Sequence, residues 1–250
     1  MSFKILGGNL LFRYIEEPEE TEVIIPDGIE VLGSQSFFRS KNLEVLTIPE
    51  GVKVIESRAF EYCYELKEIT IPKSMKVIES KAFKGCYKLR KIRTDNGVET
   101  ISNDAFFYCN LNCLTWQGIR IPLESDDAYY MADILKMIYH RDMRASIPTS
   151  TKYSINWAMY CLYPDDEKII RYIQKDFQAM FQYLIDENQW EILNKALHSG
   201  KFVKLKNIDE LIRYAIQKQN YEMQAMLISY KNQHFGYQDT TDKLKLSAER

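Results

Sequence analysis

The sequence predicts an α+β protein in two segments, a repeat solenoid followed by an all-α stack of helical hairpins. The first observation is a period of 23 residues that runs from residue 24 to 116. Its apolar ladders are Ile29, Val52, Met75 and Val98, then Leu32, Ile55, Ile78 and Ile101, then Phe37, Phe60, Phe83 and Phe106. The second observation is that from residue 125 the apolar residues recur at the intervals of an α-helix and no longer follow the repeat. A fixed period of this size indicates stacked units that share one continuous core.

The chain opens with a predicted hairpin that caps the solenoid. Its strands are expected at Phe3–Leu6 and Leu10–Ile15, and Gly7-Gly8 forms the turn between them. Each following coil is predicted to carry one short strand, because an Ile-Pro pair ends it and proline cannot donate to a ladder. A closing hairpin is expected at Trp116 and 119–121, turned at Gln117-Gly118. Just before it, one residue is missing from the period, as is common in a terminal coil.

The repeat itself carries a family resemblance. The pattern reads LxxIxIPxxVxxIxxxAFxxC. It resembles the leucine-rich repeats of the BspA type, known from bacterial and some protozoal proteins, over about residues 1–121. The resemblance implies a curved solenoid with one short strand per coil and no catalytic residues. It also implies that some relatives are surface adhesins, a role that travels with secretion signals.

The second segment, 125–236, is predicted to be all helical. After a helix that Ser125 caps and that buries Ala128, Met131, Leu135 and Ile138, six more are expected at 153–162, 166–175, 177–187, 189–198, 207–218 and 220–232. Weak similarity at a step of 31 residues favours stacked helical hairpins. The segment from Asn207 is similar to an ankyrin-type helix pair but lacks the TPLHxA motif. Residues 237–250 are predicted to form a polar tail.

Strand alternation predicts a binding surface on the concave strand face of the solenoid. If Val23, Leu46, Ile69, Ile92 and Leu114 point inward, their neighbours point outward. The outward set is Glu22, Ile24, Val45, Thr47, Glu68, Thr70, Lys91, Arg93, Cys113 and Thr115. The candidate binding residues are Val45, Thr47, Glu68, Thr70, Lys91, Arg93 and Thr115. Threonine and valine are also good strand formers, so their presence is explained equally well by strand formation alone.

Two other surfaces compete with that face. Basic side chains crowd the third repeat at Lys73, Lys76, Lys81, Lys84, Lys88, Arg90 and Lys91, with Arg93 after it. They could bind phosphates, but they are spread around the whole coil, so a nucleic-acid partner is disfavoured. Aromatic side chains flank the cysteine ladder at Tyr62, Tyr64, Tyr87, Phe107 and Tyr108. We expect these rings to pack along the solenoid or against the helical segment.

The sequence contains no catalytic constellation, so an enzyme is not predicted and no cofactor or metal is expected. The chain has three histidines, and none has a second histidine at the sequence spacing typical of metal ligands; they are His140, His198 and His234. Cys63, Cys86 and Cys109 occupy one repeat position, where Ser40 stands in the first repeat, so they are interpreted as small buried residues. The odd total of 5 cysteines fits a reducing compartment better than a fully disulfide-paired secreted protein. The net charge of −2 gives no reason to expect a polyanionic partner.

Together these features predict a non-enzymatic protein–protein interaction module with a protein partner. No apolar run approaches the length of a membrane helix, so membrane insertion is not expected. As written, the chain is expected in the cytoplasm. The main alternative is a secreted or cell-surface adhesin whose signal peptide was removed. A more distant alternative is nucleic-acid binding through the lysine-rich third repeat.

Overall fold

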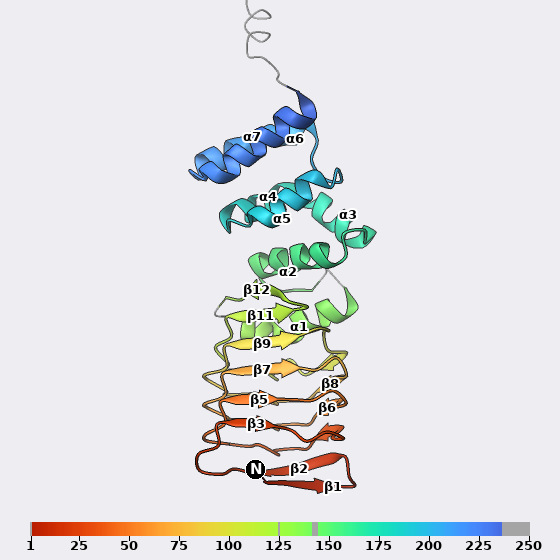
Figure 1. Cartoon of the computed structure of the whole chain (residues 1–250), viewed down its shortest axis with the longest axis vertical. Coiled ribbons are helices and arrows are strands. Elements are labelled where there is room, and N and C mark those ends of the chain that lie inside the picture. Colours follow the sequence, from red (N-terminus) through yellow and green to blue (C-terminus); the bar gives the residue numbers. More distant parts are fainter. Residues whose placement is uncertain (1, 125, 142–144, 237–250) are drawn as a thin grey trace, which may run out of the picture. The chain divides into compact units, whose positions relative to one another are not determined.

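The computed structural model describes residues 2–124, 126–141 and 145–236 (Figure 1). The chain divides into two compact units, residues 1–158 and 159–250, and helix α2 (Thr149–Leu162) spans the division. The predicted cap at Ser125 and the predicted tail at 237–250 lie outside the described residues.

The first unit contains a solenoid with two sheets, in which successive coils pair in parallel and the terminal hairpins pair antiparallel. The sheet of longer strands follows the order β12-β11-β9-β7-β5-β3. Its members are β3 (Glu22–Ile24), β5 (Val45–Thr47), β7 (Glu68–Ile71), β9 (Lys91–Thr94), β11 (Cys113–Trp116) and β12 (Ile119–Pro122). Successive coils pair in parallel at the repeat step, so that Leu46 lies opposite Ile69 and Ile69 opposite Ile92. Figure 1 shows these strands stacked one above another. The predicted repeat solenoid is confirmed.

A second sheet joins the cap hairpin to four strands of two residues each, which are too short to leave an alternating pattern in the sequence. It follows the order β1-β2-β4-β6-β8-β10. Its strands are β1 (Ser2–Leu6), β2 (Leu10–Ile15), β4 (Val31–Leu32), β6 (Val54–Ile55), β8 (Val77–Ile78) and β10 (Thr100–Ile101). The antiparallel pair β1 and β2 is the predicted cap hairpin. The structure thus adds a second, two-residue strand to the single strand predicted for each coil.

An aromatic column runs through the solenoid core. Phe37, Phe60, Phe83 and Phe106 are at most 1% exposed, and successive ring centroids lie 4.7–5.0 Å apart. Tyr14 of β2 continues the column, with its ring centroid 4.9 Å from that of Phe37. Stacked aromatic rings stabilise beyond their buried area by about 0.5–1.5 kcal/mol per pair. The column therefore stabilises the contact between each pair of neighbouring coils.

The cysteine ladder lies beside this column and bonds to the coil before it. The thiols of Cys63, Cys86 and Cys109 donate to the carbonyl oxygens of Phe37, Phe60 and Phe83 over 3.1–3.2 Å. In the first coil the Ser40 hydroxyl donates to Phe37 O instead, over 2.9 Å. All three thiols are buried and free of disulfides. The position therefore selects a small donor, which either serine or cysteine provides.

The solenoid closes with the hairpin of β11 and β12 and with helix α1 (Asp127–His140). Helix α1 packs against the fourth coil and buries Met131, Leu135 and Ile138. A Cβ atom at Gly97 would lie 2.2 Å from Leu135 O, so glycine allows the helix to approach. By its contacts α1 belongs to the unit that contains the solenoid. The division at 121–125 suggested by the sequence stays a prediction.

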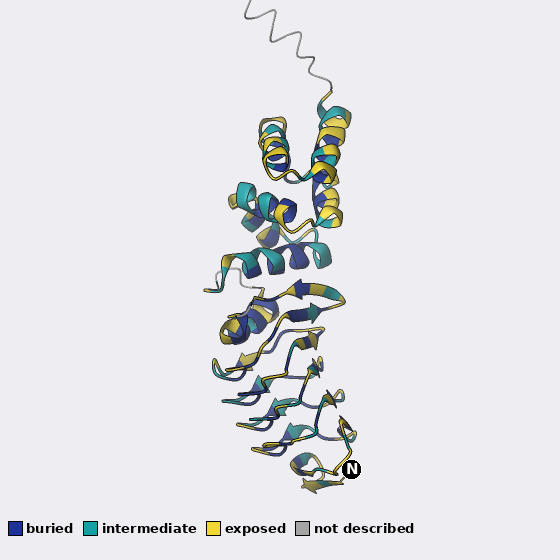
Figure 2. Cartoon of the chain, turned by 90° about the vertical axis from the view of Figure 1, so that its left-hand side faces the viewer, coloured by how far each residue is buried: buried dark blue, intermediate teal, exposed yellow. Residues whose placement is uncertain are grey.

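The second unit contains the remaining helices. They are α3 (Glu167–Lys175), α4 (Phe177–Asp186), α5 (Trp190–His198), α6 (Leu205–Gln217) and α7 (Tyr221–Phe235). Helices α4 and α5 contact each other, as do α6 and α7, and α4 also contacts α6. The buried sides of these helices appear dark blue in Figure 2. All seven predicted helices are present, although α2 begins four residues earlier than expected, at Thr149 rather than 153.

The weak 31-residue similarity has a backbone counterpart between the hairpins. Asn188 and Gln219, one period apart, both adopt positive φ, at 52° and 56°. The next residues, Gln189 and Asn220, donate their backbone N–H groups to Leu184 O and Ala215 O. The turn of α4–α5 is thus repeated in α6–α7, as stacked helical hairpins require.

Candidate functional site

The outward side chains of the longer sheet form two rows that cross the strands. In the first row Glu22, Val45, Glu68 and Lys91 lie opposite one another along the ladder. In the second row the order is Ile24, Thr47, Thr70, Arg93 and Thr115. The intervening positions Val23, Leu46, Ile69, Ile92 and Leu114 are at most 2% exposed. We call the nine outward residues the strand face. All seven candidate binding residues lie on it and are adjacent in register.

Charge and polarity change along the strand face. Its first strand offers Glu22 and Ile24, and the side chain of Ile24 is 62% exposed. Further along, Arg93 bonds to Glu68 across neighbouring strands and neutralises it. Lys91 is exposed and forms no ion pair with any described residue. The face therefore leaves one ammonium group available toward its later strands.

A hollow lies where the later strands end. It measures about 270 Å³ and is lined from the strand face by Thr70, Arg93 and Thr115. Its far side comes from the turns, where Lys73 and Asp95 form an ion pair of 3.1 Å. Glu50 also lines it and accepts the backbone N–H groups of residues 73 and 74 over 3.0 and 3.2 Å. Sequence reasoning missed these turn residues, because only the three-dimensional coil brings the turns of neighbouring repeats together.

One outward residue was assigned wrongly. Cys113 was expected on the strand face, but it is only 3% exposed. It lies opposite Pro122 of the closing hairpin, where the regular coil ends. Its sulfur lies 4.0 Å from the Thr115 hydroxyl. The first row therefore ends at Lys91.

The basic cluster of the third repeat is largely engaged within the protein. Lys88 pairs with Glu65 at 2.5 Å and Lys73 with Asp95 at 3.1 Å, each pair linking neighbouring coils. The Lys84 ammonium lies 5.7 Å from the centre of the Tyr108 ring, a cation–π arrangement. These pairs lower the positive charge that the cluster could offer to a phosphate backbone.

The aromatic flank is only partly covered. Phe107 packs against Tyr129 of α1, with ring centroids 5.2 Å apart, as the expected packing against a helix requires. Tyr64 and Tyr87 stack at 5.6 Å but remain 41% and 48% exposed. The flank therefore contributes to the solenoid and still presents tyrosine rings to solvent.

The described residues provide no evident reactive centre. Burial raises the pKa of the Cys86 thiol well above its ordinary value. Burial also raises the pKa of Cys161, and nearby Lys195 offsets only part of this rise. Raised pKa values suppress the thiolate that a nucleophilic cysteine needs. Among the residues that the structure describes, no group of three His, Cys, Asp or Glu side chains is arranged to hold a metal ion.

The first part of the chain folds as a leucine-rich-repeat solenoid, with its longer sheet exposed. The family described as "BspA type Leucine rich repeat region" matches residues 12–124 in six copies. The predicted BspA-type repeats are thereby confirmed for the first part of the chain. The comparisons leave the helical region unassigned, so its ankyrin-like character stays a prediction. A comparison with curated proteins found no match.

Several solved bacterial structures match part of the chain. The pneumococcal vaccine antigen PcpA is 26% identical over 44% of this chain and 27% of its own length, with a TM-score of 0.41. A leucine-rich repeat protein from Bacteroides capillosus is 28% identical over 46% of this chain and 93% of its own, with a TM-score of 0.40. One from Bacteroides ovatus is 26% identical over 44% and 32%, with a TM-score of 0.37. The chain thus spans about a quarter of PcpA and a third of the Bacteroides ovatus protein.

None of the helices in the described parts of the chain is both long and apolar enough to cross a bilayer.

Proposed function

We propose that the chain is a non-enzymatic protein-binding module whose partner lies on the strand face. The observation that supports this most is the register of two outward rows across parallel strands, beside a hollow lined by Thr70, Arg93 and Thr115. A strand face held by a buried ladder is rigid, so a partner binds it with little loss of conformational entropy. Leucine-rich repeats are commonly used in this way.

The chemistry of the face indicates what the partner presents. The exposed Ile24 and Val45 side chains offer apolar area toward the first strands. The ammonium group of Lys91, without an ion pair among the described residues, favours an acidic group on the partner opposite the later strands. The partner surface is therefore expected to be apolar at one end and acidic at the other.

The test is a double substitution, Thr70→Arg with Lys91→Glu, which adds bulk at the hollow and reverses the free charge. The matched control is Thr100→Arg with Lys76→Glu, because these exposed residues give the same changes at the other sheet. Each variant is used to capture partners from a lysate of the native organism, with chemical crosslinking and mass spectrometry as the readout. We expect the strand-face variant to lose the crosslinked partner and the control to keep it. Equal capture by both variants, with unchanged circular dichroism, would rule out this face.

Two alternative functions can be tested on the same protein. A secreted or cell-surface adhesin would use the same face toward a host or neighbouring-cell protein, and mapping the native start codon distinguishes it by an upstream signal peptide. Nucleic-acid binding through the third repeat would weaken steeply as salt rises. The ion pairs of Lys73 and Lys88 argue against that alternative, because they already neutralise part of the cluster.

A further inference from the structure

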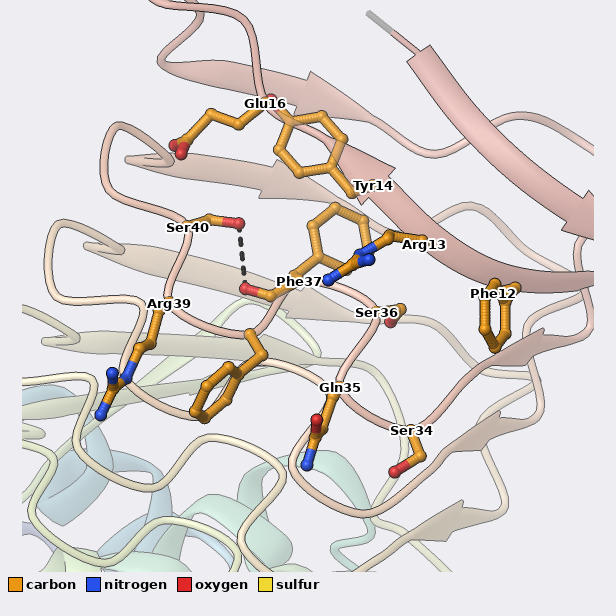
Figure 3. A pocket seen from close by; sticks show the side chains of 11 residues that line it. Phe12, Arg13, Tyr14, Glu16, Ser34, Gln35, Ser36, Phe37, Arg39 and Ser40 are labelled. Carbon is orange, nitrogen blue, oxygen red and sulfur yellow. Dashed lines mark hydrogen bonds between the residues drawn. The ribbon is translucent and has the colours of Figure 1, made fainter.

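The cap hairpin leaves a second hollow on the chain, away from the strand face. Between β2 and the first coil lies a cavity of about 330 Å³ (Figure 3). From β2 it is lined by Phe12, Arg13 and Tyr14, and from the coil by residues 34–40. We call this cavity the cap pocket. Its size falls in the range of about 300–1,000 Å³ that is typical of small-molecule sites.

The cap pocket exists because the stretch from Leu11 to Tyr14 is two residues shorter than the stretch from Leu32 to Phe37 that it faces. Leu11 lies opposite Leu32, a step of 21, whereas Tyr14 stacks on Phe37, a step of 23. Tyr14 therefore follows Leu11 by three positions in the cap, whereas Phe37 follows Leu32 by five in the first coil. We call these two matched pairs, Leu11 with Leu32 and Tyr14 with Phe37, the rungs. The rungs themselves are held, since Gly33 N donates to Leu11 O and Tyr14 N to Ser36 O, both over 2.8 Å. The missing residues leave Ser34 and Gln35 of the turn at 34–36 exposed.

A buried polar group lies at the end of this turn and lines the pocket. In the later coils its position is occupied by Ala59, Ala82 and Ala105, all completely buried. The first coil has Ser36, which is 2% exposed, and its hydroxyl oxygen has no hydrogen-bond partner among the described residues. Leaving such a hydroxyl unpaired costs free energy, and alanine would avoid the cost. Serine at this position is understandable if the hydroxyl serves a group that enters the pocket.

The remaining polar groups of the cap pocket are mostly donors. Its one carboxylate, Glu16, already accepts the N–H groups of residues 41 and 42 over 3.0 and 2.6 Å. The hydroxyls of Ser34 and Ser40 donate to backbone carbonyls. Arg13 and Arg39 are exposed and form no ion pair with a described residue, and Arg39 instead lies 5.1 Å from the centre of the Phe38 ring. The pocket thus offers two guanidinium groups and one free hydroxyl against a single engaged acid.

We propose that the cap pocket binds a small organic anion, a carboxylate or phosphate on an apolar or aromatic body. The anion bonds to the guanidinium of Arg13 on β2 and to the hydroxyl of Ser36 in the first coil, both of which line the pocket. Figure 3 shows Arg13 and Ser36 among the side chains that line the pocket, with Phe12 at the edge of the group. Phe12 is 51% exposed and Phe38 is 36% exposed, so both present apolar area to the body of the ligand. Guanidinium matches the geometry of carboxylate and phosphate oxygens.

The test uses the full chain with phenyl phosphate and phenylacetate as probes and benzyl alcohol as the uncharged comparison. Binding is followed by the chemical shifts of backbone amides. We expect both anions to shift the amides of residues 12–14 and 34–40 in a saturable way at millimolar concentration, and the alcohol to leave them unchanged. Saturable shifts elsewhere, or no shifts at all, would overturn the proposal.

Three variants separate ligand binding from structure. Arg13→Gln is expected to weaken the anions about tenfold, a change typical of one lost charge-assisted hydrogen bond. Ser36→Ala is expected to weaken binding and at the same time to raise the melting temperature of the unliganded protein, because it removes the unpaired hydroxyl. The control is Arg120→Gln, an exposed arginine on β12 that should bind as the wild type does. A lower melting temperature for Ser36→Ala would show that the fold itself satisfies the hydroxyl, and the proposal would fail.

The anion can be a free metabolite or the carboxyl terminus of a peptide, and one comparison separates these sources. A short peptide that ends in phenylalanine is titrated with a free and with an amidated carboxyl group. Tighter binding of the free-acid peptide than of phenylacetate identifies chain termini, whereas binding of phenylacetate alone identifies small acids. Equal binding of the free and amidated peptides would contradict recognition of an anion. The Arg13→Gln variant keeps the strand face, so failure here is distinct from failure of the proposed function.

Discussion

In the solenoid each coil depends on its neighbours, whereas in residues 159–236 helical hairpins close locally. The Phe37 N–H group bonds to Ala59 O and the Phe60 N–H to Ala82 O, so each rung joins residues 22 positions apart. In the second unit α6 and α7 are consecutive and contact each other directly. A defect in a solenoid rung is therefore felt by the coils on both sides. A defect in a helical hairpin stays within a short stretch of chain.

The acids of the two regions show the same contrast. Asp166 accepts the N–H groups of residues 168 and 169, and so caps its own helix α3. In the solenoid, Glu79 accepts the N–H and hydroxyl of Ser57 in the preceding coil, over 2.9 and 2.8 Å. The same kind of side chain thus stabilises a local element in one region and joins distant segments in the other.

Replacing Phe60 by alanine should give the largest effect, because it removes the middle of the aromatic column. Large-to-small changes of a buried Phe cost about 3–5 kcal/mol. We expect urea unfolding followed by circular dichroism to show this loss, and hydrogen exchange to speed up in the coils of both Phe37 and Phe83. The control is Tyr64→Ala, a half-exposed stacked ring that should cost only about 0.5–1.5 kcal/mol. Equal costs for the two variants would mean that the column does not connect the coils.

Replacing Leu211 by alanine tests the other side of the comparison. Leu211 is completely buried in α6, and the substitution should cost about 2–5 kcal/mol. We expect hydrogen exchange to speed up in α6 and α7 while amides of the solenoid keep their protection. Ile216→Ala on the same helix is the control, because Ile216 is 50% exposed. Loss of protection throughout the solenoid would contradict local closure.

The difference between the regions also explains what the sequence could predict. Ladders such as Phe37, Phe60 and Phe83 can be recognised in the sequence because each coil places the same residue type at the same buried position. The two-residue strand at Val54–Ile55 was missed because two positions cannot display alternation. The start of α2 was placed late because Thr149, Ser150 and Thr151 are poor helix formers. The hydroxyls of Ser150 and Thr151 here donate to the carboxylates of Glu124 and Asp127.

The candidate sites follow the same rule. The strand-face residues could be selected from alternation alone, since the ladder fixes which side chains point outward. The turn residues Lys73 and Asp95 could not, because their meeting depends on the path of the coil. The cap pocket depends on the two-residue offset between β2 and the first coil, which appears only when both rungs are matched. Its one signal in the sequence is Ser36 in a column of alanines.

The smallest expected effect concerns Asp104 and its dependence on pH. Asp104 accepts hydrogen bonds from the Ser80 hydroxyl and the Lys81 N–H group, over 2.9 and 3.2 Å, so it joins the third and fourth coils. It also accepts the hydroxyl of Ser102 over 2.7 Å. Burial by itself raises the pKa of Asp104, but these hydrogen bonds together lower it below its ordinary value. The link is therefore strongest when the carboxyl group is ionised.

The sign of the effect follows from that lowered pKa. Because the folded protein holds this proton less tightly than the unfolded chain, the stabilisation is present above the unfolded pKa and is lost as pH falls through the folded one. We expect Asp104→Asn to cost about 1 kcal/mol at neutral pH and almost nothing in acid, below an unfolded pKa of about 4. The measurement is the urea midpoint of both proteins between neutral and acid pH, with Asp27→Asn, a change at an exposed turn, as the control. A cost for Asp104→Asn that is the same at every pH would mean that the charge does not hold the two coils together.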